Sequence, residues 1–129
     1  MTKHARGMFQ VQIKPLGDDA ADSSLARMSI DKEFHGELKG TSKGQMLAAA
    51  TTVKDSAGYV AIERVTGTLQ NRHGTFLLQH HGLMSRGTGD LRITVIPDSG
   101  TDQLLGLAGT MTIIVAGGEH SYDFEYSLG

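Results

Sequence analysis

The sequence predicts an all-β protein of about eight strands, either a sandwich or, as the sheet edges and glycines favour, a closed barrel. First, apolar and polar residues alternate in many short segments, as they do in strands with one buried face. Second, turn residues such as Gly117-Gly118 separate the segments, and no convincing long helix is present. Third, Gly67, Gly106 and Gly109 lie inside expected strands, where a small barrel needs bends. Closure would also remove the exposed edges of an open sheet.

In the N-terminal half, the alternation is simplest near the start of the chain. Phe9, Val11 and Ile13 alternate with polar residues, which predicts a strand. The alanines of Gln45–Lys54 suit a short helix, but its Thr-Thr-Val run favours a strand. The other elements expected in this half are a polar loop at Pro15–Ser24, a strand at Ala26–Phe34 that Gly36 and Gly40 bend or end, and a strand at Tyr59–Leu69.

In the C-terminal half, the alternation is cleanest from His120 to Leu128, where aromatic and apolar residues occupy most alternate positions. Pro97-Asp-Ser-Gly-Thr101 predicts a turn in which Asp98 and Ser99 cap backbone amides. The remaining expected elements are a hairpin turn at Asn71–Gly74, strands at Thr75–Leu83, Asp90–Ile96 and Leu104–Val115, and a hairpin turn at Gly117-Gly118.

Length and composition exclude several classes of function. A chain of 129 residues is expected to form one domain, residues 1–129, with residues 1–7 as a flexible N-terminus. A formal charge of −2 gives no attraction to nucleic acid or to an anionic membrane. Cysteine is absent, which excludes disulfides and zinc–thiolate sites. Without a signal peptide or a long apolar run, a soluble cytoplasmic protein is expected, with neither a nucleic-acid nor a membrane partner.

Most of the chain resembles a bacterial family of unknown function, family 3224 of domains of unknown function. The matching pieces are Lys32-Glu-Phe-His-Gly36, Gly58-Tyr-Val-Ala-Ile-Glu63, Gly67-Thr-Leu69, Gly74-Thr-Phe-Leu-Leu-Gln-His80, Pro97-Asp-Ser-Gly-Thr101, Leu104-Leu-Gly-Leu-Ala-Gly109 and His120-Ser-Tyr122. This family is similar in fold to the allene oxide cyclase barrels, so the resemblance implies an eight-stranded antiparallel barrel. It implies no established activity and no catalytic residues.

The residues that could carry chemistry follow from the faces of the strands. Lys32, Glu63, His80, His120 and Tyr122 are expected to point into the barrel, although both faces of the Glu63 segment are mostly apolar. Two interpretations remain open. Lys32 and Glu63 could form a buried ion pair, with the histidines satisfied by backbone or tyrosine groups. Alternatively, these groups form the polar end of a ligand pocket.

The ligand-binding candidates are therefore Lys32, Tyr59, Glu63, His80, His120 and Tyr122. Glu63 and His80 are candidates for a general base. No pair of close ligands on one face supports a metal site, so neither a metal nor a cofactor is expected. Gly40-Thr-Ser-Lys-Gly44 matches the G-x-S-x-G string, but no strand-to-helix turn accompanies it, and a hairpin turn is the favoured interpretation.

Three functions remain compatible with the sequence. The leading hypothesis is an uncharacterised barrel that binds a small, partly apolar molecule in its interior. The first alternative, from fold analogy, is an isomerase or cyclase that uses Glu63 in an apolar cavity. The second alternative is a structural or interaction module whose outward residues Val60, Ile62 and Leu77 form a subunit interface, so that a homo-oligomer is conceivable.

Overall fold

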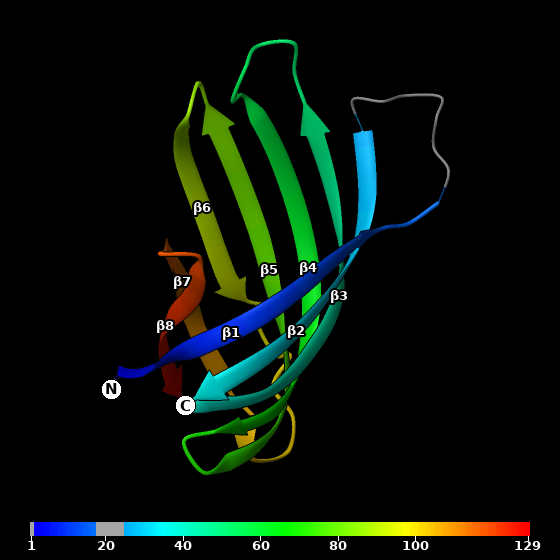
Figure 1. The fold of residues 1–129 in the computed structure, drawn as a ribbon. Coiled ribbons are helices and arrows are strands. Elements are labelled where there is room, and N and C mark those ends of the chain that lie inside the picture. Colours follow the sequence, from blue (N-terminus) through cyan, green and yellow to red (C-terminus); the bar gives the residue numbers. More distant parts are fainter. Residues whose placement is uncertain (1, 18–24) are drawn as a thin grey trace.

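The described residues, 2–17 and 25–129 of a computed structural model, form a closed barrel of eight antiparallel strands (Figure 1). Each strand pairs with the next one in the sequence, and the last strand pairs with the first. The strands are β1 (Lys3–Pro15), β2 (Leu25–Gly36), β3 (Leu38–Ala50), β4 (Ala57–Leu69), β5 (Arg72–Ser85), β6 (Thr88–Val95), β7 (Leu107–Ala116) and β8 (Glu119–Leu128). A short 3-10 turn, Asp102–Leu104, precedes β7. None of the described residues form a helix long and apolar enough to cross a membrane.

The core lies inside the barrel because side chains alternate between the two faces of each strand. On β4, for example, Ala61, Glu63 and Val65 are buried, whereas Ile62 and Arg64 are exposed. Aromatic rings fill the centre: Phe124 packs against Phe76 at a centroid distance of 5.7 Å and against Tyr126 at 5.4 Å. This filled core positions the inward residues of β4 and β5.

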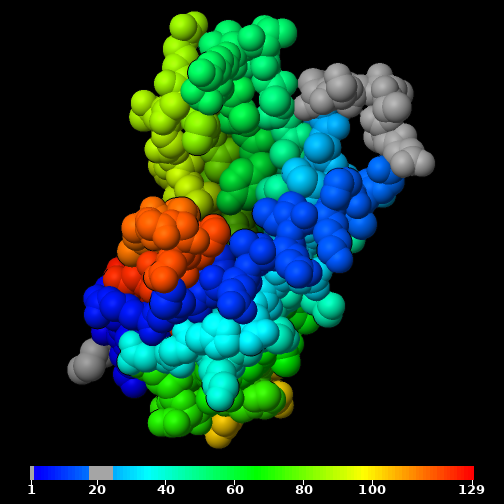
Figure 2. Space-filling view, in the orientation of Figure 1, coloured from blue at the N-terminus to red at the C-terminus, as the bar shows by residue number. Residues whose placement is uncertain are grey.

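In the described part of the chain, one end of the barrel is open. In Figures 1 and 2 the ends of β3, β4, β5 and β6, drawn in green and yellow-green, extend beyond β1 and β8. β6 pairs with β7 only at Ile93–Met111 and Thr94–Thr110, so the sheet is held together weakly at this seam. Several inward-facing apolar side chains at this end are between 44% and 64% exposed: Ile13, Met84, Leu91 and Val115. We call this end the mouth of the barrel.

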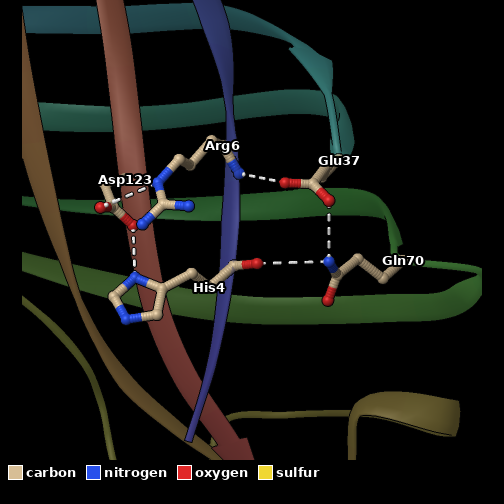
Figure 3. Close-up of polar contacts among 5 residues, drawn as sticks. All are labelled: His4, Arg6, Glu37, Gln70 and Asp123. Carbon is tan, nitrogen blue, oxygen red and sulfur yellow. Dashed lines mark hydrogen bonds and ion pairs between the residues drawn. The ribbon is translucent and has the colours of Figure 1, made fainter.

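At the opposite end Leu38 and Leu69 are fully buried, and we call it the closed end. A largely exposed polar network surrounds Glu37 and Asp123 near this end (Figure 3). Glu37 accepts hydrogen bonds from the backbone N–H of Arg6 (2.8 Å) and from Gln70 Nε2 (3.0 Å), which also donates to the backbone oxygen of His4 (3.3 Å). Asp123 contacts Arg6 Nε at 3.2 Å and His4 Nδ1 at 2.8 Å. These contacts tie β1 to β8 and to the turns that follow β2 and β4.

The loop after β6 substitutes for a strand along the edge of β5. Ser99 Oγ accepts a hydrogen bond from the backbone N–H of Leu77 (3.0 Å), and Thr101 Oγ1 accepts one from that of Thr75 (2.9 Å). Backbone groups need such partners wherever the ladder is interrupted. The expected capping role of Ser99 is thus seen, whereas Asp98 contributes a left-handed backbone conformation, with φ of 63°.

Several expectations about single elements differ from the structure. The expected hairpin turn at Gly40–Gly44 is wrong, because these residues lie within β3. Lys3–Gly7, expected to be flexible, belong to β1 and pair with β8. The strand expected from Leu104 begins at Leu107, so Gly106 lies outside β7 and adopts φ of 84°. In the expected polar loop, Pro15 ends β1, and residues 18–24 are outside the described part.

Candidate functional site

The centre of the candidate site is the carboxylate of Glu63, which is fully buried in β4. Three strands contribute groups that contact it. Lys32 Nζ from β2 lies 2.8 Å from Oε2, and Ser42 Oγ from β3 donates to Oε1 at 2.8 Å. His80 Nε2 from β5 lies 2.5 Å from Oε2. We call Lys32, Ser42, Glu63 and His80 the Glu63 cluster.

Strand register and a glycine bring the Glu63 cluster together. Lys32 pairs with Ser42 across β2 and β3, and Gly44 pairs with Glu63 across β3 and β4. A Cβ atom on Gly44 would lie 2.6 Å from the Cα of Glu63. Gly44 therefore allows β3 and β4 to approach closely beside the carboxylate.

The cluster keeps Glu63 ionised. Burial raises the pKa of Glu63, but the hydrogen bond from His80 and the charge of Lys32 outweigh burial and lower it to about 2. The Lys32 ammonium is held over two aromatic rings, 5.1 Å from the centroid of Phe9 and 5.8 Å from that of Phe34. The Lys32–Glu63 ion pair is thus stabilised at both ends, by the aromatic rings around Lys32 and by the hydrogen bonds to Glu63.

Tyr59 connects the cluster to the mouth. An ionised carboxylate only accepts hydrogen bonds, so His80 donates through Nε2–H to Glu63. In a neutral imidazole, the remaining nitrogen, Nδ1, is an acceptor, and the Tyr59 hydroxyl lies 3.2 Å from it. Burial, followed by the charge of Glu63, raises the pKa of Tyr59, so the phenol remains protonated and can donate.

A cavity of about 550 Å³ opens above Tyr59 in the mouth. Its walls are mostly apolar: small residues of β3 and β4 such as Ala48, Ala50 and Ala57 line it, together with Tyr59, Met84 of β5 and Leu91 of β6. Gly82 also lines the cavity, and a Cβ atom there would lie 2.3 Å from Cε1 of Tyr59. The Tyr59 ring therefore lies against the backbone of Gly82.

The structure brings four of the six predicted ligand-binding residues together: Lys32, Tyr59, Glu63 and His80. The other two lie elsewhere in the barrel. The Tyr122 hydroxyl accepts the backbone N–H of Leu38 at 2.9 Å and lies 2.8 Å from the backbone oxygen of His35, next to the closed end. His120 is half-buried, with its ring 5.2 Å from that of Phe9.

Sequence reasoning missed Ser42, which is buried and donates to Glu63. The G-x-S-x-G string drew attention to this residue for an unrelated reason. A better signal was available, because Leu38, Gly40, Ser42 and Gly44 occupy alternate positions and therefore share one face of a strand. Within residues 2–17 and 25–129, no three His, Asp or Glu side chains are placed to hold one metal ion.

A second hollow, of about 560 Å³, lies on the outer face of β3 and β4. Its apolar residues Leu47, Val60 and Ile62 are 50%, 51% and 50% exposed. Leu77, expected to share this outer face, is half-buried, and its backbone N–H is bonded to Ser99. The polar residues of the hollow are ordinary surface side chains, so the mouth, with a buried cluster behind it, is the stronger candidate site.

The comparisons with known proteins agree with this fold. The profile of the family described as "Protein of unknown function (DUF3224)" matches residues 5–126. The chain belongs to this family. A crystal structure of a DUF3224 protein of unknown function from Shewanella oneidensis MR-1 is 44% identical, with a TM-score of 0.95 over 100% of this chain and 98% of that one. No curated protein matches the chain.

The predicted family and the eight-stranded barrel are thus confirmed, whereas the similarity of the family to allene oxide cyclases stays a prediction. The Shewanella protein is itself described as having unknown function. The features of this DUF3224 protein that bear on function are the Glu63 cluster and the cavity above Tyr59.

Proposed function

We propose that the mouth of the barrel binds a small, largely apolar molecule whose polar end lies against Tyr59. The observation that supports this proposal most is the position of an apolar cavity directly above a buried and fully paired polar cluster. Ligand sites typically combine apolar walls with a few convergent polar groups, and their volumes range from roughly 300 to 1,000 Å³. The cavity of about 550 Å³ falls within this range.

Stability alone is a weak explanation for the Glu63 cluster. A buried ion pair is often no more stabilising than apolar residues of similar volume, because both charges must leave water. The cluster also extends through His80 to Tyr59, a half-buried residue that lines the cavity. A purely structural ion pair does not require this extension.

The isomerase or cyclase alternative depends on which group could take a proton. Both oxygens of Glu63 are already hydrogen-bonded, and a pKa of about 2 makes this carboxylate a weak base at neutral pH. His80 Nδ1, reached through Tyr59, is the better candidate, with Glu63 as its positioning residue. NMR of the bicyclic ketone α-tetralone in deuterium oxide tests this alternative. If His80 acts as a base, the wild-type protein exchanges the α-hydrogens of the ketone for deuterium, and the His80→Gln variant does not.

The outer-surface alternative is supported by Val60 and Ile62, which are half-exposed apolar residues on one sheet face. A homo-oligomer through this face stays a prediction. Light scattering over a range of protein concentrations decides it, because a monomer at every concentration would contradict a subunit interface here.

Binding in the mouth can be tested with N-phenyl-1-naphthylamine, a neutral dye that fluoresces in apolar sites. Ala48 and Leu47 are neighbours on opposite faces of β3, so Trp at each position makes a matched pair. We expect saturable fluorescence with the wild type and with Leu47→Trp, and at least tenfold weaker binding with Ala48→Trp.

A second blocking variant, Met84→Trp at the rim, guards against a folding defect in Ala48→Trp. Circular dichroism then establishes which variants are folded. The proposal is wrong if the wild type shows no saturable binding, or if Leu47→Trp abolishes binding while both blocking variants retain it.

A further inference from the structure

The hydrogen bonds between Glu63 and the mouth have a fixed direction. Glu63 is ionised and accepts from His80 Nε2–H, which leaves Nδ1 of the neutral imidazole as an acceptor. The Tyr59 hydroxyl lies 3.2 Å from Nδ1, and with a neutral imidazole its single hydrogen is donated to that nitrogen. The phenol oxygen can then offer only lone pairs to a molecule in the cavity. The polar end of the cavity is therefore a hydrogen-bond acceptor.

The buried charges of the Glu63 cluster already balance each other. Among the described residues, Lys32 is the single buried amine and Glu63 the single buried carboxylate. These two groups already compensate each other at 2.8 Å. A second proton on His80 would add a positive charge that no further buried carboxylate could compensate, and burying such a charge is costly.

No lysine or arginine is among the described residues that line the cavity. The Lys32 side chain is 5% exposed, contacts Glu63 and does not line the cavity. At the rim, Asp90 lines the cavity and its Oδ1 lies 3.6 Å from Nε of Arg92, so this exposed pair is neutral as a unit. An anion in the mouth would meet the Tyr59 oxygen, a hydrogen-bond acceptor, and no lysine or arginine in the lining of the cavity.

From this geometry we infer that the mouth selects neutral molecules that carry a hydroxyl group on an apolar body. The ligand hydroxyl donates a hydrogen bond to the Tyr59 oxygen, and the apolar body packs against the walls of the cavity. The carboxylate analogue of the same molecule is excluded. This inference rests on the proposed binding function and adds to it the chemical class of the ligand.

Four aromatic probes with the same ring system test the inference by fluorescence titration at pH 7. They are 2-naphthol, which donates a hydrogen bond; 2-methoxynaphthalene, which only accepts; 2-naphthoate, which is an anion; and unsubstituted naphthalene. We expect 2-naphthol to bind about tenfold more tightly than 2-methoxynaphthalene, a difference of ~1.4 kcal/mol. We expect 2-naphthoate to bind more weakly than both.

A pair of Tyr→Phe variants assigns the preference to one hydroxyl. Tyr59→Phe should reduce the preference for 2-naphthol over 2-methoxynaphthalene to less than about twofold. Tyr126→Phe should leave it unchanged, because the Tyr126 hydroxyl donates to Gln70 near the closed end. Retention of the full preference in folded Tyr59→Phe would overturn the assignment.

The inference and the binding function fail in different ways. If none of the four probes binds, the proposed function is wrong. If naphthalene and 2-methoxynaphthalene bind as tightly as 2-naphthol, or if 2-naphthoate binds best, the function survives and the inferred ligand class is wrong. Nitrogen NMR of the His80 ring gives an independent readout: we expect hydrogen on Nε2 alone, and hydrogen on both ring nitrogens would overturn the inference.

Discussion

Replacing Glu63 by Gln removes the buried negative charge and keeps the shape of the side chain. The Gln carbonyl can accept from Lys32 and His80, as Glu63 Oε2 does, and its NH₂ group can donate to the Ser42 hydroxyl. The substitution therefore leaves the hydrogen-bond pattern possible and makes Lys32 an uncompensated buried charge. Any loss of stability in Glu63→Gln thus measures the charge.

The expected loss of stability follows from two independent magnitudes. The pKa of Glu63 is about 2, against 4.5 for the unperturbed group, and this difference corresponds to roughly 3 kcal/mol. Breaking a buried ion pair by removing one partner costs ~3–5 kcal/mol. We therefore expect the free energy of unfolding to fall by about 3 kcal/mol and the melting temperature by roughly 10 °C.

Urea unfolding followed by circular dichroism measures this change. Two controls accompany it. Lys43→Met breaks the exposed pair with Asp31, 3.0 Å apart, and should change stability by less than ~1 kcal/mol. Lys32→Met combined with Glu63→Gln removes both buried charges and should recover much of the loss. A Glu63→Gln protein within about 0.5 kcal/mol of the wild type, well below the expected range, would refute the reasoning.

Three further predictions follow from the same contacts. Because the pKa of Glu63 is lowered in the folded state, the ionised carboxylate stabilises the protein fully above about pH 4.5, and this stabilisation is lost as pH falls through about 2. The difference in stability between the wild type and Glu63→Gln should therefore shrink in that window. A constant difference would contradict this prediction. Tyr122→Phe leaves the buried N–H of Leu38 without its acceptor and should cost ~1–3 kcal/mol in urea unfolding; an unchanged midpoint would show that another acceptor replaces the hydroxyl. Gly82→Ala should displace the Tyr59 ring and weaken dye binding, with a stability cost of ~1–3 kcal/mol; unchanged affinity and stability would mean that the ring does not need this contact.

Alternation predicted the strands and the inward direction of the main polar residues, and the family resemblance pointed to a barrel and not a sandwich. Alternation placed Lys32 beside Ile30 and Phe34, and His80 beside Phe76 and Leu78, and these faces are buried in the structure. Periodicity succeeds here because the two faces of a half-buried strand meet different surroundings. The face of Glu63 was ambiguous because Val60 and Ile62 make the outer face of β4 apolar as well.

Other features could not be predicted from alternation. Glycines and polar residues at 40–44 resembled a turn, which hid both the middle of β3 and the inward position of Ser42. Contacts across strands depend on register, and a pattern within one strand carries no information about register. The short pairing between β6 and β7 beside the mouth is a tertiary feature without a local signal in the sequence.

The central claim is that the mouth above Tyr59, and not the outer sheet face, is the binding site. Methyl NMR spectra recorded during titration with N-phenyl-1-naphthylamine test it most directly, because Ala48 and Leu91 line the mouth whereas Leu47 and Ile62 line the outer hollow. We predict saturable shifts of the Ala48 and Leu91 methyl signals and no shifts of the Leu47 and Ile62 signals. Shifts confined to Leu47 and Ile62, or no shifts at all at saturating dye, would contradict the claim.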